Sequence, residues 1–186
     1  MQQQRRRNKL ILGGLTVGLL AGAALAGPSQ AAIGAGPYYA EPAWDRKLPA
    51  ATRFLILTNW NSEAVLDKES GLVWERSPVI AAVTWEGGRT ACMARTTGNR
   101  KGWRLPSVHE LASLVDPSVS IGPTLPSGHP FPTVQSALYW SATTRTEDPT
   151  LAWLVAFSNG NVGDGSKGTS GPSFWCVRGG MNADQY

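Results

Sequence analysis

The amino-acid sequence predicts an α+β fold with two helices, several short and mostly antiparallel strands, and long loops. Three observations lead to this prediction. Short apolar runs are bounded by turn residues, which is typical of strands. Two segments carry helix-start signals, and the clearer one is followed by apolar residues at helical spacing. Long stretches rich in proline and glycine separate these segments and follow no regular period.

The first half of the chain is expected to hold strands and then a helix. Strands are predicted at residues 53–58, 64–67 and 72–75. The turn at residues 68–71 ends in glycine, so the strands on either side of it should form a hairpin. Thr84 then caps a first helix over residues 85–94. Gly87 and Gly88 lie inside that helix, where each costs up to about 1 kcal/mol.

The strongest local signal is the segment Trp103-Arg-Leu-Pro-Ser-Val-His-Glu-Leu111. Ser107 can cap the first backbone N–H groups of a helix while Glu110 reaches back to it, which makes a capping box. Pro106 ends the extended segment before the helix. Apolar residues then recur at helical spacing and predict a helix of about ten residues. These residues are Val108, Leu111, Ala112 and Val115.

The rest of the chain is expected to alternate loops with strands. Residues 116–134 hold five prolines without a regular period, so they should form a long irregular loop. Asn159-Gly160 is a strong hairpin signal, and residues 158–172 are expected to be a glycine-rich surface excursion. Strands are predicted at residues 138–143, 151–157 and 173–178.

The N-terminus carries an export signal. Four basic residues precede an apolar run over residues 10–26 that ends in a small-x-small motif. We expect a signal peptide over residues 1–26, with Ala31 as the second candidate cleavage site. A retained anchor helix is the alternative, but five glycines in and just after the run disfavour it. The protein is therefore expected to be periplasmic, on the cell surface or extracellular, with no membrane span after cleavage.

After the signal, the sequence predicts a linker or arm over residues 27–51, a folded domain over residues 52–179 and a tail over residues 180–186. The first 31 residues hold four of the 17 basic residues and none of the 13 acidic ones, so the rest carries 13 of each. The basic excess therefore belongs to targeting, and we expect no nucleic-acid partner.

The chain has two cysteines, Cys92 and Cys176, and both lie in the exported part. An oxidising compartment and an even count predict a disulfide between them. A pair of reactive thiols is the alternative, but no CxxC spacing supports it. Hydrolase, zinc, P-loop and dinucleotide motifs are missing from the sequence. We therefore expect no catalytic residues, no metal ligands and no cofactor, with His109 on the solvated side of the second helix.

Eight tryptophans are many for a chain of this length. Such residues can form a platform for sugar rings, or they can fill a core that has little regular structure. Trp44 and Trp60 have polar or loop surroundings and are expected to be exposed. Core positions are predicted for the tryptophans in or beside apolar runs, which are Trp74, Trp103, Trp140, Trp153 and Trp175.

Candidate ligand-binding residues are polar, basic or exposed aromatic residues. A local basic patch around residues 95–104 can bind a polyanion. The short-chained polar segment 159–167 is typical of binding loops, although a solvated hairpin fits it equally well. The candidates are Trp60, Arg95, Arg100, Lys101, Asn159, Asn161, Asp164 and Lys167.

Arg104 and Arg178 flank apolar segments. A structural ion pair is favoured for each over a ligand clamp, and the candidate partners are Glu75, Glu110 and Asp116. We expect the residues around these arginines to be architectural. They are Trp74, Trp103, Leu105, Pro106, Glu110 and Trp140.

Several segments together resemble the Lcl C-terminal domain family, formerly called DUF1566. The order and spacing fit over residues 53–179, although Gly87-Gly88 stands where the family has a better helix former. The matching pieces are Val65–Arg76, Thr84-Trp85, Cys92, Trp103–Leu111, Leu114–Asp116, Phe131-Pro132, Tyr139–Thr143, Ala152-Trp153, Phe157, Gly160 and Cys176–Gly179.

The resemblance implies a C-type-lectin-like fold in exported or surface bacterial proteins, and the family's namesake is an adhesin that engages glycosaminoglycans. The calcium–sugar signatures of true C-type lectins, Glu-Pro-Asn and Trp-Asn-Asp, are absent. We expect an adhesin-like, non-catalytic module that binds a glycan or protein ligand at the bacterial surface or envelope through loops 118–134 and 158–172. The alternatives are a cysteine-dependent oxidase related to formylglycine-generating enzymes, or a passive structural subunit of a surface assembly, where an oligomer would be expected.

Overall fold

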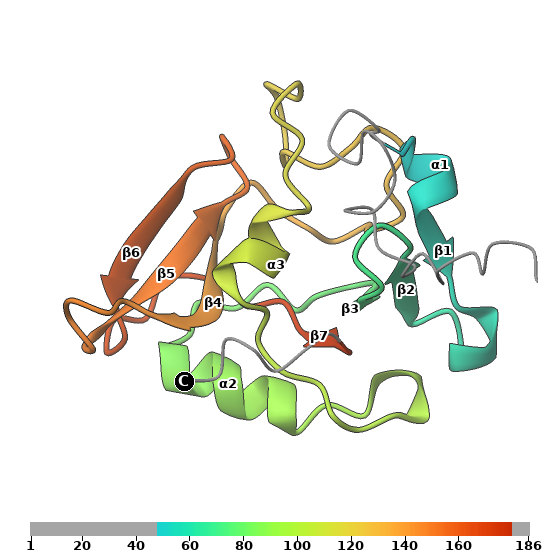
Figure 1. The fold of residues 1–186 in the computed structure, drawn as a ribbon. Coiled ribbons are helices and arrows are strands. Elements are labelled where there is room, and N and C mark those ends of the chain that lie inside the picture. Colours follow the sequence, from blue (N-terminus) through green and yellow to red (C-terminus); the bar gives the residue numbers. More distant parts are fainter. Residues whose placement is uncertain (1–47, 180–186) are drawn as a thin grey trace, which may run out of the picture. The chain divides into compact units, whose positions relative to one another are not determined.

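A computed structural model describes residues 48–179, and Figure 1 shows them as a coloured ribbon. The predicted signal peptide, most of the predicted arm with Trp44, and the tail 180–186 lie outside the described residues. Within residues 48–179, no helix is long and apolar enough to cross a bilayer.

The described residues form two antiparallel sheets with short helices between and beside them, so the α+β prediction is confirmed (Figure 1). The first sheet has the order β1-β2-β3-β7, with strands Phe54–Ile56, Ala64–Asp67, Val73–Glu75 and Val177–Arg178. The second has the order β4-β5-β6, with strands Leu138–Thr144, Leu151–Ala156 and Val162–Ser166. The α-helices are α1 (Ala50–Arg53), α2 (Trp85–Met93) and α3 (Val108–Ala112), and the 3₁₀ helices are η2 (Thr58–Trp60) and η3 (Thr97–Asn99).

The predicted disulfide is present. Cys92 and Cys176 are bonded, and both are buried. The bond joins the last turn of α2 to the residue just before β7, so it ties a helix to the end of the first sheet. The predicted hairpin is also confirmed, because β2 and β3 pair with Val65 opposite Trp74.

An aromatic cluster centred on Trp175 fills the space between the two sheets. The ring centroid of Trp175 lies 4.8 Å from that of Phe131 and 5.2 Å from that of Trp74. Tyr139 and Phe157 complete the cluster and pack edge to face. A second cluster surrounds the disulfide and contains Leu105, Phe174 and two further tryptophans. Trp74, Trp103, Trp140 and Trp175 are therefore core residues, as predicted.

Trp153 was predicted to be buried, and the structure shows that it is partly exposed. Its partner across the sheet is Asp164 on β6, which is the edge strand. Asp164 is polar and lies on an edge strand, so it leaves this face of the sheet open to solvent. The Trp153 ring packs against the core on one side and keeps contact with solvent on the other.

Helix α2 begins as predicted, with the Thr84 side chain accepting a hydrogen bond from the Gly87 N–H. Gly88 has a packing role that compensates for its low helix propensity. A Cβ atom at this position would lie 3.3 Å from the Cβ of Phe174 and 3.6 Å from a methyl group of Val83. The glycine thus lets the helix approach the segment that carries Cys176.

Helix α3 has the predicted capping box, in which Ser107 accepts from the Glu110 N–H and Glu110 accepts from the Ser107 N–H. The predicted length was wrong, because the helix ends after five residues. The N–H groups of Leu114 and Val115 donate to carbonyls three residues back, which tightens the last turn. The next N–H, of Asp116, donates to the Thr124 carbonyl instead of continuing the helix.

Further element boundaries differ from the prediction. Residues 162–166 form strand β6 and not a loop, because their backbone completes the ladder with β5 after the Asn159-Gly160 turn. The closing strand is only two residues long, since residues 173–176 cross from the second sheet to the first. The predicted strand 53–58 is shortened at both ends by α1 and η2. Helix α1 also starts inside the predicted arm 27–51.

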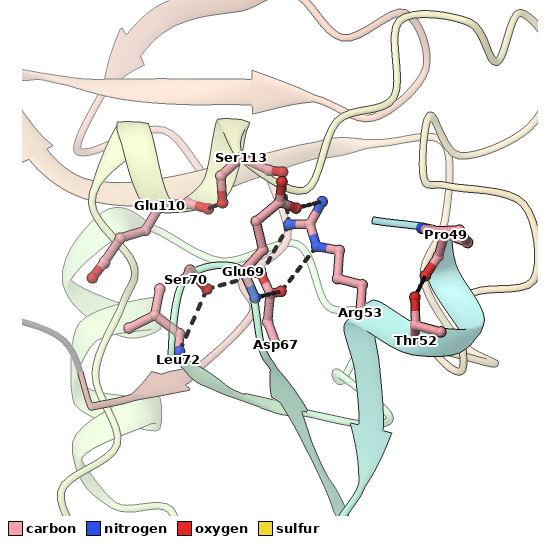
Figure 2. Close-up of polar contacts among 9 residues, drawn as sticks. All are labelled: Pro49, Thr52, Arg53, Asp67, Glu69, Ser70, Leu72, Glu110 and Ser113. Carbon is pink, nitrogen blue, oxygen red and sulfur yellow. Dashed lines mark hydrogen bonds and ion pairs between the residues drawn. The ribbon is translucent and has the colours of Figure 1, made fainter. Parts of the chain in front are cut away.

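A buried arginine fastens the first sheet to α3 (Figure 2). The Arg53 Nε and Nη2 atoms donate to the two carboxylate oxygens of Asp67 at 2.9 and 2.8 Å. The same guanidinium donates to the Ser113 carbonyl and pairs with Glu69 at 2.7 Å. Arg53 and Asp67 are both buried. The sequence did not reveal this network, because Arg53 reads as the polar start of an apolar strand.

Candidate functional site

Several of the predicted ligand-binding residues gather around Trp60. The guanidinium carbons of Arg100 and Arg178 lie 5.3 and 5.4 Å from the centre of the Trp60 ring, within cation–π range. The Arg178 Nε donates to the Lys101 carbonyl at 2.9 Å, which brings Lys101 beside them. Trp60 is partly exposed, and Arg100 and Lys101 are exposed. These four residues are called the Trp60 face.

The fold positions the Trp60 face through a close contact between η2 and η3. Gly98 in η3 has φ +63°, and a Cβ atom there would lie 2.8 Å from the Cβ of Trp60. Its N–H donates to the Glu63 carboxylate at 2.7 Å. Beneath the ring, Trp103 packs edge to face at 6.5 Å. The role of Gly98 was not predicted from the sequence. The available signal was its place between two polar residues in Thr97-Gly98-Asn99, which is typical of a turn.

Within residues 48–179, no ion pair joins a carboxylate to a cation of the Trp60 face. Among residues 48–179, the arginines that form ion pairs are Arg53, Arg89, Arg95, Arg104 and Arg145. The guanidiniums of Arg100 and Arg178 lie beside the Trp60 ring, and the exposed Lys101 adds a third cation next to Arg100 in the chain. The prediction of a carboxylate partner for Arg178 was wrong. Within the described residues, the Arg178 guanidinium contacts the Lys101 carbonyl and the Trp60 ring instead.

Arg104 has the structural role predicted for it. Its two terminal nitrogens each lie 2.7 Å from a carboxylate oxygen of Glu110, so the pair is bidentate. The same side chain donates to the Leu105 and Gly179 carbonyls. Because Glu110 also completes the capping box of α3, this pair links the helix to the end of the described chain.

An open polar pocket of about 550 Å³ lies next to η3, and Thr97 and Asn99 are among the residues that line it. Residues from the β2 and β3 ends form one wall, and residues after α2 form the other. The main polar groups that line it are those of Ser62, Glu63, Glu75, Arg76, Arg95 and Thr97. It is called the Glu75 pocket. Sequence reasoning missed it, because its walls are separated in the chain and meet only through tertiary packing.

Glu75 lines this pocket, and its carboxylate is largely enclosed by the fold. The Thr97 hydroxyl donates to Oε1 at 2.9 Å, and the Arg95 Nε lies 3.0 Å from the same oxygen. Within the described residues, Oε2 accepts no hydrogen bond of normal geometry. Burial raises the pKa of Glu75 above its ordinary value of 4.5, while Arg95, the Thr97 hydroxyl and the Cys176 backbone act in the opposite direction. Arg95, expected in an open basic patch, is thus an ion-pair partner inside the pocket.

Titration of Glu75 should show this burial directly. Its carboxyl ¹³C resonance is expected to titrate above 4.5, and Arg95→Gln should raise the midpoint further because Arg95 lowers the pKa. The folded state holds this proton more tightly than the unfolded state. The contribution of Glu75 to stability is therefore greatest at low pH and falls as pH rises from 4.5 through the raised pKa. A midpoint at or below 4.5 would contradict the burial of this carboxylate.

The predicted loop residues lie elsewhere and make contacts of their own. Asp164 on β6 forms an ion pair with Arg145. The Lys167 Nζ donates to the Thr144 hydroxyl at 2.8 Å and lies 4.2 Å from the centre of the Trp85 ring. In Figure 1, β6 lies at the opposite side of the described residues from β1, which leads into η2. Asn159 and Asn161 are exposed in the β5–β6 turn, so this group does not join the Trp60 face.

The loop 118–134 contributes more to the core than expected. Leu125, Phe131 and Val134 are buried in the aromatic cluster. The tip of the loop is open, and Ile121 is 89% exposed. His129 is half-buried, its Nδ1 accepts from the Phe131 N–H, and burial lowers its pKa. His109 is exposed on α3, as predicted.

The residues that the structure describes contain no group of three or more His, Cys, Asp or Glu side chains able to hold a metal ion.

A family model, the Lcl C-terminal domain, matches residues 63–178. The chain belongs to this family. The match contains both cysteines, the capping box and all the residues that line the Glu75 pocket except Ser62. In this Lcl C-terminal domain Trp60 lies just before the matched segment, whereas Arg100, Lys101 and Arg178 lie within it. A search of curated proteins finds no match.

Proposed function

We propose that this Lcl C-terminal domain is an exported, non-catalytic binding module that recognises an acidic glycan at the bacterial surface or envelope. The proposal includes a C-type-lectin-like role for the fold, in which two small sheets and a disulfide present a ligand face. The observation that carries it is the Trp60 face, where the guanidiniums of Arg100 and Arg178 lie against one partly exposed indole ring and form no ion pair within residues 48–179. The Lys101 carbonyl binds Arg178, and its side chain adds an exposed cation.

The charge of the Trp60 face favours an anionic ligand. Guanidinium groups bind carboxylate, sulfate and phosphate oxygens through paired N–H donors. Stacking on Trp60 and the bond to the Lys101 carbonyl hold Arg178 in place before a ligand arrives. The Arg178 side chain is therefore already ordered in the free protein, so ligand binding loses less side-chain entropy.

The aromatic ring favours a glycan over a protein segment. Trp60 is braced by Trp103 and Gly98 and is partly exposed. Sugar rings offer an apolar C–H surface to such an indole, and acidic sugars add the anion that the adjacent cations require. The neighbouring polar pocket adds hydroxyl-binding groups within the same region.

A non-catalytic role is supported by the state of the cysteines. An oxidase that resembles formylglycine-generating enzymes needs accessible, reactive thiols. Cys92 and Cys176 are both fully buried and bonded to each other. The bond joins two core elements, which is the placement of a structural disulfide.

Retention on immobilised heparin tests the proposal. The protein purified from expression of the full chain should bind heparin, and added salt should weaken this binding because it screens exposed charges. Arg100→Gln and Lys101→Gln should each reduce affinity about tenfold, the effect of losing one charge-assisted hydrogen bond. Lys68→Gln is the matched control, since Lys68 is an exposed cation on the β2–β3 turn.

Three results would count against an acidic-glycan site at the Trp60 face. The first is failure of the wild-type protein to bind heparin at low salt. The second is equal weakening by Lys68→Gln and Arg100→Gln, which would indicate net charge without a defined site. The third is binding of an unrelated acidic protein with the same variant profile and no binding of acidic polysaccharide, which would favour a protein ligand.

A further inference from the structure

We propose that the β5–β6 part of the second sheet binds a neutral sugar ring, which stacks on Trp153 and donates a hydroxyl group to Asp164. The site is called the Trp153 face, and it consists of the side chains of Trp153, Val162, Asp164 and Ser166. It goes beyond the acidic-glycan site at the Trp60 face and does not depend on it. In Figure 1, β6 lies at the opposite side of the described residues from β1, which leads into η2 with Trp60.

Strand β6 displays its side chains beside Trp153. Successive residues of a strand point to opposite faces of a sheet, and directly paired residues share a face. Trp153 lies directly opposite Asp164, and Val162 and Ser166 stand two residues to either side of Asp164. These four side chains therefore belong to one face of the sheet, and the three on β6 are exposed.

Glycine occupies the positions of β6 that face the other way. A Cβ atom at Gly165 would lie 2.9 Å from a methyl group of Leu154 and 3.4 Å from the ring of Trp140. Both of these residues belong to the core cluster around the disulfide. The alternation Val-Gly-Asp-Gly-Ser thus packs one side of the strand closely and places its larger side chains on the Trp153 face.

The Trp153 indole has a donor that no protein group uses. Within residues 48–179 its N–H makes no hydrogen bond, and it is not among the buried unpaired polar atoms, so solvent reaches it. The indole N–H groups that do donate to backbone carbonyls are those of Trp85, Trp103, Trp140 and Trp175. A partly exposed ring with a free N–H offers a sugar both an apolar surface and a hydrogen bond.

Asp164 supplies an acceptor that a ligand can reach. Its side chain is 29% exposed, and its Oδ2 accepts from the Arg145 Nη1. Within the described residues, Oδ1 accepts no hydrogen bond. A hydroxyl group that donates to this oxygen makes a charge-assisted hydrogen bond, which is stronger than one between neutral groups. The exposed hydroxyl of Ser166 adds a second polar contact on the same face.

The charges beside Trp153 favour a neutral ligand over an anion. Arg145 forms ion pairs with both Asp164 and Glu147, so these three groups carry a net charge of about −1 at neutral pH. Val162 is 48% exposed and extends the apolar surface next to the ring. A sugar ring covers that surface with its C–H groups, whereas a small hydrated cation does not.

A chemical-shift titration of the full chain with a panel of neutral methyl glycosides tests the Trp153 face. At least one glycoside should shift the Trp153 indole N–H and the amides of Gly163, Asp164 and Gly165. The expected Kd is about 1–10 mM for a single sugar ring. Trp153→Phe assigns the indole resonance by removing it and keeps an aromatic ring against the core.

Asp164→Ala should weaken glycoside binding about tenfold, because it removes one charge-assisted hydrogen bond. Glu86→Ala is the matched control and should leave binding unchanged. Glu86 is also an exposed acidic residue that pairs with a single arginine, Arg89, but it lies on α2 and outside the Trp153 face.

Two results with the wild-type protein would overturn the inference without any variant. The first is a Trp153 indole N–H that no glycoside shifts. The second is a larger shift with methylammonium than with every glycoside, which would indicate a cation site. Equal glycoside binding by the wild type and Asp164→Ala would overturn the role of Asp164.

Heparin retention and glycoside titration separate this inference from the proposed function. Heparin retention that depends on Arg100, together with an unshifted Trp153 indole, leaves the acidic-glycan site standing and removes the neutral site. Glycoside shifts at the Trp153 face without heparin retention leave the neutral site standing and remove the acidic site.

Discussion

A Cys92→Ala/Cys176→Ala protein is expected to have a free energy of unfolding about 4–5 kcal/mol lower than that of the wild type. The bond closes a loop of 84 residues, and such a loop restricts the unfolded chain strongly. Small domains are stable by only about 5–15 kcal/mol, so this loss removes a large share of the total. Alanine is the suitable replacement, because serine would bury a hydroxyl group at two fully buried positions.

Urea denaturation followed by tryptophan fluorescence measures the effect of removing the disulfide. Wild-type protein unfolded with a reductant present should lose a similar amount of stability, which controls for any packing change caused by alanine. A loss below about 1 kcal/mol would show that other contacts already hold α2 beside the end of the first sheet.

Asp67→Ala is expected to destabilise the protein by about 3–5 kcal/mol, because it leaves the buried Arg53 guanidinium without its main partner. Figure 2 shows that Asp67 accepts both bonds of the arginine fork and also binds the Glu69 N–H and the Ser70 hydroxyl in the β2–β3 turn. The substitution therefore affects the turn and the contact to Ser113 together.

A double variant separates the two contributions to the cost of Asp67→Ala. Arg53→Met/Asp67→Leu removes both charges and should recover most of the stability lost in Asp67→Ala, since paired burial of charge is close to neutral overall. Thermal or urea unfolding of the three proteins provides the comparison. If Asp67→Ala costs less than about 1 kcal/mol, Glu69 alone is sufficient to balance the guanidinium.

Local signals in the sequence predicted the parts of the fold that local interactions control. The capping box at Ser107, the Thr84 cap, the β2–β3 hairpin and the turn at Gly160 depend on residues a few positions apart. The end of α3 was not predictable in this way. It is set by a hydrogen bond from Asp116 to Thr124, across a loop whose path the sequence does not specify.

Strand β6 shows a second limit of sequence reasoning. Its sequence Val-Gly-Asp-Gly-Ser has low strand propensity and no apolar alternation. It is a strand because β5 supplies a complete row of backbone partners at the sheet edge. The closing segment, residues 173–178, shows the opposite case. Its apolar sequence predicts a longer strand, but residues 173–176 cross from one sheet to the other, so only Val177–Arg178 pair as a strand.

The sequence predicted residues of the Trp60 face but not the Glu75 pocket. Trp60, Arg100 and Lys101 could be identified because an aromatic residue in polar surroundings and clustered cations point to a surface. The Glu75 pocket could not be identified, because Glu75 reads as the polar end of a strand and Arg95 as a surface cation. Only the packing of the α2 C-terminus against β3 places them 3.0 Å apart.

The most direct test of the central claim is chemical-shift mapping of the full chain with a heparin-derived tetrasaccharide. The Trp60 indole N–H and the amides of Gly98, Arg100, Lys101 and Arg178 are expected to shift together and to saturate with one affinity. Shifts confined to the 158–172 segment, or scattered over exposed lysines and arginines without saturation, would contradict it.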